Sequence, residues 1–259
     1  MARFAPHPRR RPAIVTGASS GIGRATALAL AAAGHPVALG ARRIERLEEA
    51  AAEIVSAGGS ACCFRLDLAE AGSIESFVKA VGDALGDVDV LVSAAGQNLP
   101  DSAVDPAPDQ FAATVAVNLL GVQRLVSLVL PPMVARGHGD IVFVTSEVVA
   151  VPRVRTAAYV SSKWGLHGYA RTLQMELEGT GVRASIVQPG QTTSEMGQDW
   201  DPEVTTDVLG EWIRWGAARH GNFLRPEAVA DAVRSVVSVP RGTHLTLVEI
   251  QPQAPGGRS

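Results

Sequence analysis

The stretch Thr16-Gly17-Ala18-Ser19-Ser20-Gly21-Ile22-Gly23 decides how the rest of this chain is interpreted. It follows a short apolar run, 13–16, and it precedes an alanine-rich amphipathic run, 22–33. Glycines allow a tight turn and a close approach of the backbone to a pyrophosphate, and a helix N-terminus supplies amide donors. Three glycines alone are weak evidence. Their position between an expected strand and an expected helix is the context that predicts a dinucleotide-binding loop.

Outward from this loop, short apolar runs alternate with longer amphipathic runs. The expected strands are 13–16, 36–40, 61–66, 88–92, 140–145, 182–187 and 244–250. The expected helices are 22–33, 44–57, 73–85, 109–134, 157–179 and 226–237. Nearly continuous apolar strands between helices predict an α/β fold, a single Rossmann-type doubly wound parallel sheet of about seven strands with helices on both faces. We expect one domain, 12–252, mobile tails at 1–11 and 253–259, and a substrate flap at about 192–224.

The overall composition is that of an ordinary globular protein, with 46% apolar and 19% charged residues. A net charge of -3 does not suggest nucleic acid as a partner, and no apolar run looks long enough to span a membrane. The segment 1–12 lacks the apolar core of a secretory signal. Cys62 and Cys63 are adjacent, which disfavours an ordinary disulfide and offers no metal-ligand spacing. These features fit a reducing cytoplasm and predict no metal site.

Two arginines, Arg42 and Arg43, stand at the end of the second expected strand. A carboxylate there would hold the adenosine ribose and repel a 2′-phosphate. Guanidinium groups pair with phosphate through two parallel hydrogen bonds, so this strand end favours NADP(H) over NAD(H). We expect Arg42, nearer the strand, to bind the phosphate with help from Ser19, and one of the two arginines only to be solvated. After the third strand, Asp67-Leu68 is placed either to meet the adenine amine or to cap a helix.

Tyr159 and Lys163 are four residues apart on an expected helix, which places them on one face, one turn apart. A phenol with a pKa of about 10 exchanges protons poorly near neutral pH, and a neighbouring ammonium group lowers that pKa. Of 23 lysines and arginines, just Lys79 and Lys163 are lysines, which suggests a position where arginine will not serve. The pair alone is better explained as a surface helix with chance spacing. The rest of the chain changes that interpretation.

Taken together, the glycine loop, Asn118, Ser146, the Tyr159–Lys163 pair and Pro189-Gly190 resemble the classical short-chain dehydrogenase/reductase family. The resemblance extends over about 13–252. It implies that Tyr159 is the general acid or base, and that Lys163 lowers the phenol pKa and binds the nicotinamide ribose. It also implies that Ser146 holds the substrate oxygen and that Asn118 anchors a water that relays protons to the lysine. Ser161 and Ser162 are expected to be simple exposed helix residues.

The same resemblance implies a set of cofactor contacts. They are Gly17, Ser19, Ser20, Gly21, Ile22, Gly23, Arg42, Arg43, Asp67, Leu68, Ala95, Gly96, Tyr159, Lys163, Pro189, Gly190 and Thr192. Two positions depart from the family pattern. Thr192 replaces a more usual valine or isoleucine, and Ser93-Ala94-Ala95-Gly96 stands where Asn-Asn-Ala-Gly is usual. The second departure puts local rigidity in question more than activity.

These features predict an NADP(H)-dependent oxidoreductase that exchanges hydride with a secondary alcohol or ketone. Trp200, Trp212 and Trp215 in the flap suit a bulky apolar substrate, but they could equally pack the flap onto the body or a neighbouring subunit. The C-terminal end resembles NADP-dependent hydroxy-acid dehydrogenases more than 3-oxoacyl-carrier-protein reductases. The alternatives are such a reductase, or an NADP(H)-binding sensor without chemistry. We expect a homotetramer, or a homodimer, paired through the helices 109–134 and 157–179.

Overall fold

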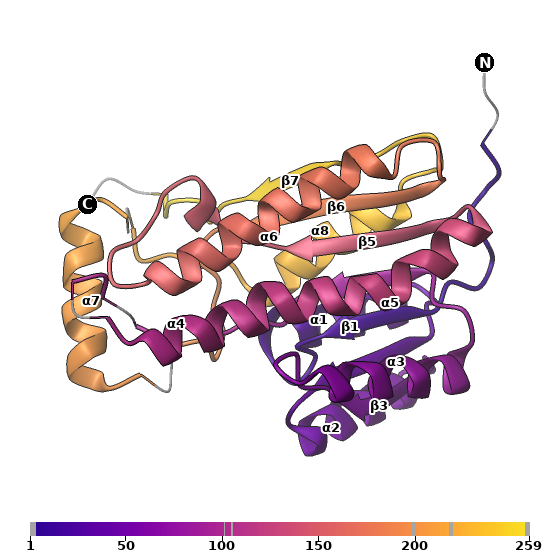
Figure 1. The fold of residues 1–259 in the computed structure, drawn as a ribbon, viewed down its shortest axis with the longest axis horizontal. Coiled ribbons are helices and arrows are strands. Elements are labelled where there is room, and N and C mark those ends of the chain that lie inside the picture. Colours follow the sequence, from indigo (N-terminus) through magenta and orange to yellow (C-terminus); the bar gives the residue numbers. More distant parts are fainter. Residues whose placement is uncertain (1–3, 101, 105, 198–199, 218–219, 257–259) are drawn as a thin grey trace.

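In the part of the chain that the structure describes, seven strands form one parallel sheet in the order β3-β2-β1-β4-β5-β6-β7 (Figure 1). The computed structural model describes residues 4–100, 102–104, 106–197, 200–217 and 220–256. The strands are β1 (Ala13–Thr16), β2 (Val37–Ala41), β3 (Ala61–Arg65), β4 (Val90–Ser93), β5 (Gly139–Val144), β6 (Val182–Pro189) and β7 (Leu247–Ile250). Every neighbouring pair is parallel. The predicted doubly wound Rossmann-type sheet is confirmed.

Helices cover both faces of this sheet. They are α1 (Gly21–Ala32), α2 (Ile44–Ser56), α3 (Ala71–Leu85), α4 (Pro108–Val115), α5 (Gly121–Arg136), α6 (Ala157–Glu176), α7 (Pro202–Arg214) and α8 (Pro226–Ser238). The helices pack against the sheet through two apolar clusters. One cluster contains side chains of α3, α5 and α6 on one face, and the other contains side chains of α1, α2 and α8 on the opposite face. In β1, Ile14 belongs to the first cluster, whereas Ala13 and Val15 belong to the second. A strand whose side chains alternate between two buried faces must be apolar throughout, as the sequence pattern indicated.

The helix expected at 109–134 is interrupted by one π-helical turn, Ala116–Leu120, between α4 and α5. At Gly121 a Cβ would lie 2.0 Å from the carbonyl oxygen of Leu68, so the helix passes here against backbone. A single π turn re-aims the side chains within an otherwise regular helix, and such turns are frequent at functional sites. In this turn Asn118 is completely buried.

An 18-residue window within the same helical run, Pro108–Arg136, has a mean hydropathy of 1.7, so by length and composition the run could cross a membrane. This differs from the expectation that no run would be long enough, because that expectation considered uninterrupted apolar stretches. In the fold the run packs against α3 and α6. A single such helix in the described chain is weak evidence for a membrane span, since core helices share this composition.

The segment 1–11, expected to be a mobile tail, packs onto the body at its inner end. Arg11 is 7% exposed and forms ion pairs with Asp89 and Asp140, which lie at the amino ends of β4 and β5. His7 also lies 2.9 Å, through Nε2, from the carbonyl oxygen of Val239. The packed body therefore begins before residue 12, because Arg11 adds a guanidinium that pairs with both buried carboxylates.

The flap expected at about 192–224 contains a helix, α7, which the sequence reading left unassigned. Asp201 begins this helix, because its side chain accepts a hydrogen bond from the amide of Glu203 at 2.8 Å. The two ends of the flap are joined to each other through backbone hydrogen bonds between Thr193 and Leu224 and between Leu224 and Gln191.

Candidate active site

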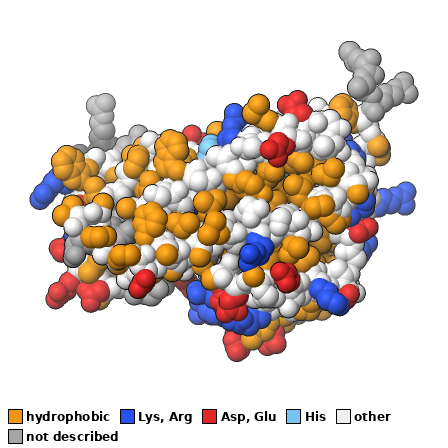
Figure 2. Space-filling view, viewed as in Figure 1, with side chains coloured by type: hydrophobic (Ala, Val, Ile, Leu, Met, Phe, Trp, Pro, Cys, Tyr) orange, Lys and Arg blue, Asp and Glu red, His pale blue; other side chains and the backbone are white. Residues whose placement is uncertain are grey.

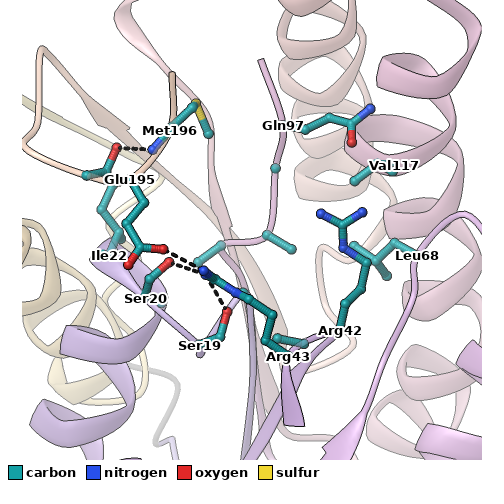
Figure 3. A pocket seen from close by; sticks show the side chains of 18 of the residues that line it. Ser19, Ser20, Ile22, Arg42, Arg43, Leu68, Gln97, Val117, Glu195 and Met196 are labelled. Carbon is teal, nitrogen blue, oxygen red and sulfur yellow. Dashed lines mark hydrogen bonds and ion pairs between the residues drawn. The ribbon is translucent and has the colours of Figure 1, made fainter. Parts of the chain in front are cut away.

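A cleft of about 630 Å³ opens at the carboxyl ends of β1, β2 and β4 (Figure 3). The strand order reverses between β1 and β4, and ligands of doubly wound sheets bind at such a point. Predicted residues that line the cleft are Gly17, Ser19, Ser20, Gly21, Ile22, Gly23, Arg42, Arg43, Asp67, Leu68, Ala95 and Gly96. The structure therefore brings together the contacts expected from the chain before residue 97.

Two glycines in the loop after β1 are required by geometry. Gly17 has a φ of +69°, and a Cβ there would lie 2.8 Å from Cα of Ala95. A Cβ on Gly23 would lie 2.3 Å from the carbonyl oxygen of Gly17. Any side chain at either position would push the loop away from the cleft, so both glycines are needed to bring the start of α1 next to it.

Of the two adjacent arginines, Arg43 faces the glycine loop. Its Nη2 donates to Ser19 Oγ at 3.1 Å and to Ser20 Oγ at 2.9 Å. The Arg42 guanidinium points to the Leu68 side of the cleft instead (Figure 3). The geometry therefore disagrees with the expected pairing of Arg42 with Ser19. The turn after β2 sends consecutive side chains to opposite sides, so nearness to the strand end did not indicate which arginine meets the loop.

Asp67 lines the cleft and also closes a local turn, since its Oδ1 accepts from the amide of Ala69 at 3.0 Å. The helix that follows has Glu70, not Asp67, as its N-cap residue. Asp67 could still contact the adenine amine from this position. Its side chain does not cap the helix itself, but it stabilises the turn that precedes the helix.

The backbone of Ser93-Ala94-Ala95-Gly96 is held by a residue that the sequence reading did not use. Thr16 Oγ1 accepts hydrogen bonds from the amides of Ala94 and Ala95, both at 3.1 Å. Thr16 is completely buried at the end of β1. This hydroxyl ties β1 to the loop after β4, so the departure from the family's usual asparagines leaves a backbone-anchored segment.

The Ser146 side chain lies close enough to Tyr159 to lower the pKa of its phenol through hydrogen bonding, and both residues are nearly buried, each 9% exposed. Ser146 ends the loop after β5 and also accepts from the amide of Val148 at 3.4 Å, whereas Tyr159 lies in the first turn of α6. Two hydroxyl groups that converge in this way can share one substrate oxygen. Ser146 thus has both the predicted position and a minor capping contact.

Lys163 is buried, and its Nζ donates to the carbonyl oxygen of Val144 at 3.0 Å. Burial lowers the pKa of Lys163 to about 8. Burial also raises the pKa of Tyr159, against the opposing effects of the Ser146 hydrogen bond and the Arg153 charge. The expectation that the lysine lowers the phenol pKa is therefore not met in the chain alone, because loss of solvation dominates both groups. Nζ lies 5.7 Å from the centre of the Tyr159 ring.

The side-chain amide of Asn118 forms three hydrogen bonds within the site. Its Oδ1 accepts from the amide of Gln97 at 2.9 Å, and its Nδ2 donates to the Gln97 carbonyl at 2.9 Å and to Ser162 Oγ at 3.0 Å. Gly96 lies beside this group: a Cβ there would be 3.4 Å from Asn118 Oδ1 and 3.6 Å from Lys163 Nζ. The amide therefore connects the loop after β4 to the helix that carries the tyrosine and the lysine.

Ser162 differs from its expected role as an exposed helix residue. It is completely buried, and its hydroxyl donates to the carbonyl oxygen of Tyr159 at 2.8 Å while accepting from Asn118. Ser161, by contrast, is exposed as expected. The sequence could have indicated this burial, because Ser162 lies on the same inward face of the helix as Tyr159 and Leu166.

Five of the expected cofactor contacts are not among the residues that line the cleft, namely Tyr159, Lys163, Pro189, Gly190 and Thr192. The last three lie at and after the end of β6. Their backbone joins the neighbouring strand, since the amide of Gly190 donates to Ile250 at 2.7 Å, and the Thr192 hydroxyl donates to Gly190. Met196 of the expected flap also lines the cleft. The lining residues that sequence reasoning missed include Arg46, Gln97, Asn98, Leu99, Val117, Ser194, Glu195 and Gly197.

Two of the three flap tryptophans pack the flap onto the body. Trp200 Nε1 donates to the carbonyl oxygen of Asn98 at 2.8 Å, and Trp212 Nε1 donates to that of Val154 at 2.9 Å. Their rings meet edge to face at 6.4 Å, and the Arg153 guanidinium lies 4.8 Å from the Trp212 ring centre. Trp215 is 71% exposed. The packing alternative therefore applies to Trp200 and Trp212.

Comparisons with known proteins show which protein family this fold and site resemble. The model of the short chain dehydrogenase family matches residues 11–205. The 3-oxoacyl-[acyl-carrier-protein] reductase of Synechocystis sp. is 31% identical over 90% of this chain and 92% of its own length. An alcohol dehydrogenase of Thermococcus sibiricus, solved with 5-hydroxy-NADP, has a TM-score of 0.82 and 31% identity over 96% of this chain and all of that one. A metagenomic short-chain oxidoreductase solved with NADP has a TM-score of 0.79 and 32% identity over 94% and 97%.

Some relatives are longer than this chain. It spans 18% of the length of glycine betaine reductase ATRR of Emericella nidulans, at 32% identity, and 64% of a short chain dehydrogenase of Pseudocercospora fijiensis, at 39% identity. The family match nevertheless extends over most of the chain, and it includes the glycine loop, the buried asparagine and the serine–tyrosine–lysine group. The chain therefore belongs to the short-chain dehydrogenase family, a family of oxidoreductases.

Proposed function

We propose that this chain is an NADP(H)-dependent oxidoreductase that interconverts a secondary alcohol and a ketone. The observation that carries the proposal is the closeness of the Ser146 and Tyr159 side chains, with Tyr159 on the same helix as the buried Lys163. Two solved structures, each about 30% identical to this chain, support the proposal because they contain NADP-type cofactors.

The residues of the cleft fit NADP(H). A Cβ at Gly17 or Gly23 would collide with the backbone of Ala95 or of Gly17, so the loop keeps bare backbone at these positions, which suits the close approach of a pyrophosphate. For the 2′-phosphate we favour Arg43, because it lies against the Ser19 and Ser20 hydroxyls. Arg42, on the Leu68 side, is assigned to the adenine end of the cleft.

When bound, the nicotinamide of the cofactor supplies or accepts the hydride. The Ser146 hydroxyl orients the substrate oxygen by donating a hydrogen bond to it. In ketone reduction Tyr159 transfers its phenolic proton to that oxygen as the carbonyl carbon is reduced, and in alcohol oxidation the phenolate takes the proton back. A raised pKa keeps Tyr159 protonated at neutral pH, the form that reduction requires. Lys163 Nζ donates a hydrogen bond to the Val144 carbonyl oxygen and has further N–H groups that can donate to the nicotinamide ribose.

The substrate is proposed to be bulky and apolar. Met196 lines the cleft and is 43% exposed, and the Trp200–Trp212 pair stands behind it in the flap. A 3-oxoacyl-type reductase is the second candidate, favoured by the match along 92% of the Synechocystis enzyme. Either class of substrate would enter between the flap and the loop after β4.

We also propose a cytoplasmic homotetramer or homodimer that pairs through the long helices. Hydrophobic side chains gather over α4, α5 and α6 (Figure 2). The largest exposed ones on these helices and the π turn are Phe111, Leu120, Leu128, Val134, Trp164 and Met175. Apolar surface of this extent on a helix pair is typical of a symmetric interface. Sedimentation velocity with a Trp164→Glu variant tests this: a smaller assembly is expected, and an unchanged mass would oppose it.

Activity is tested with a panel of aromatic, terpenoid, steroid and 3-oxoacyl ketones, followed by NADPH absorbance. Tyr159→Phe should lower the rate on every accepted ketone by roughly two to four orders of magnitude while it leaves NADPH affinity within about threefold, because the phenol supplies the proton. Turnover that survives this change would refute the mechanism. Tight NADPH binding with no turnover on the whole panel would favour a binding protein without chemistry.

A further inference from the structure

Glu195 of the flap forms ion pairs with Arg43 and Arg46, and Figure 3 shows the pair with Arg43. Its Oε2 accepts from Arg43 Nη1 at 2.7 Å, and its Oε1 accepts from Arg46 Nη1 at 2.6 Å. The two arginines follow β2, whereas Glu195 follows β6, so this contact bridges the mouth of the cleft. The remaining face of Arg43 is occupied by the Ser19 and Ser20 hydroxyls.

The chemistry of this contact is that of a phosphate site filled by a carboxylate. Two guanidinium groups share one carboxylate, which leaves an excess of positive charge. A phosphate monoester carries nearly two negative charges at neutral pH and offers three acceptor oxygens, so it satisfies the same N–H groups more fully. Hydrogen bonds from Arg43 hold the pKa of Glu195 below its usual value, so the carboxylate is ionised at neutral pH.

Glu195 is also free to leave. Its side chain is 35% exposed, and those of Arg43 and Arg46 are 47% and 49% exposed. Exposed ion pairs are weak and can exchange partners at little cost. The adjacent Met196 lines the same cleft, so a displacement of Glu195 changes the wall on the substrate side as well.

We propose that Glu195 is a placeholder for the 2′-phosphate of NADP(H). A cofactor with this phosphate displaces the carboxylate from Arg43 and Arg46 and releases the flap, whereas NAD(H) leaves the tie in place. The inference rests on the phosphate role proposed above for Arg43. It makes Glu195 a determinant of cofactor selectivity that also couples cofactor binding to the position of the flap.

The first test is the affinity of Glu195→Gln for NADPH and NADH, measured by calorimetry. Removal of the competing charge should tighten NADPH binding by about threefold to tenfold, in the range expected for release of two exposed ion pairs. Affinity for NADH should change by less than about twofold, because NADH does not compete with the carboxylate. The matched control is Glu53→Gln, which removes the same charge from an exposed pair with Arg24 on another part of the surface.

The second test observes the flap without the nicotinamide. Hydrogen exchange is measured in peptides that cover Glu195 and α7, with adenosine 2′,5′-bisphosphate and with adenosine 5′-phosphate. In the natural chain only the bisphosphate should speed exchange in these peptides. In Glu195→Gln exchange should already be fast and should not respond to either nucleotide.

The outcomes separate this inference from the function on which it rests. If Arg43→Ala weakens NADPH and NADH equally, the phosphate role of Arg43 is wrong. If Arg43→Ala weakens NADPH alone, but Glu195→Gln weakens NADPH or leaves it unchanged, the placeholder is overturned and Glu195 merely orients the arginines. If the affinity rises as expected but exchange in the flap does not respond to the bisphosphate, the coupling to the flap is overturned.

Discussion

Replacement of Arg11 by methionine should destabilise the protein far more than a change in an N-terminal segment would suggest. Arg11 Nε pairs with Asp89 and Nη2 with Asp140, and all three side chains are at most 8% exposed. Asp140 keeps a second guanidinium, since Arg183 Nε donates to it at 2.6 Å. In the described part of the chain, the ion-pair partner that remains for Asp89 is the imidazole of His138. The cost of the change therefore falls mainly on Asp89.

Removal of one partner from a buried ion pair costs about 3–5 kcal/mol, because it leaves an uncompensated charge. We expect the lower end, about 3 kcal/mol, since methionine preserves the packing of the arginine stem and Asp140 stays paired. For a domain of this size the corresponding fall in Tm is roughly 6–12 °C. Thermal unfolding followed by circular dichroism measures it. Arg9→Met, at an exposed position, is the control and should shift Tm by less than about 2 °C.

The pH dependence tests the cause. Burial acts to raise the pKa of Asp89, but the hydrogen bond and charge of Arg11, with help from His138, hold it below its usual value. This carboxylate therefore contributes stability above its unfolded pKa of about 3.9, and the contribution is lost as the pH falls through the lower folded value. In Arg11→Met, Asp89 loses its guanidinium partner, so its pKa should rise and it should take up a proton more readily. The gap in Tm should consequently narrow as the pH falls from 7 towards 4. A gap that stays constant, or a variant no weaker than Arg9→Met, would refute the reasoning.

Three further outcomes are expected. Arg43→Ala should weaken NADPH binding by roughly 1.5–3 kcal/mol, and NADH binding by far less, when both are measured by calorimetry. Arg42→Ala should weaken the binding of the two cofactors nearly alike. If Arg42→Ala instead weakened NADPH binding selectively and Arg43→Ala did not, the assignment of the phosphate to Arg43 would be overturned. Ser162→Ala should cost about 1–3 kcal/mol in urea unfolding and slow ketone reduction, because Asn118 Nδ2 and the Tyr159 carbonyl each lose a partner, whereas exposed Ser161→Ala should do neither. In the cofactor-free protein, tyrosinate absorbance should stay absent until the pH exceeds about 10, since burial raises the pKa of Tyr159 and of Tyr169; ionisation of Tyr159 near neutral pH would show that the lysine outweighs burial.

The architecture could be predicted because it depends on local patterns. Strands buried on both faces are apolar throughout, and a glycine loop between a strand and a helix occurs where the backbone must come close to a ligand. Where a helix boundary differs from the prediction, the cause lies outside the local sequence. The π turn at Ala116–Leu120 arises where Gly121 passes within reach of the Leu68 backbone, a contact between segments far apart in the sequence.

The sequence by itself determined the sheet, the glycine loop, and the residue types of the site, because spacing on a helix or at a strand end places Tyr159 and Lys163 together without long-range information. The tertiary structure alone decided the pairings. That Arg43 and not Arg42 meets the loop depends on the direction of one turn, and Glu195 reaches Arg43 from 152 residues away. Ser162 and Arg11 are buried because distant groups, Asn118 and the carboxylate of Asp89, come to rest against them. The balance of burial and charge at Tyr159 likewise exists only once the chain has folded around it, since desolvation is a property of the packed surroundings and not of the residue.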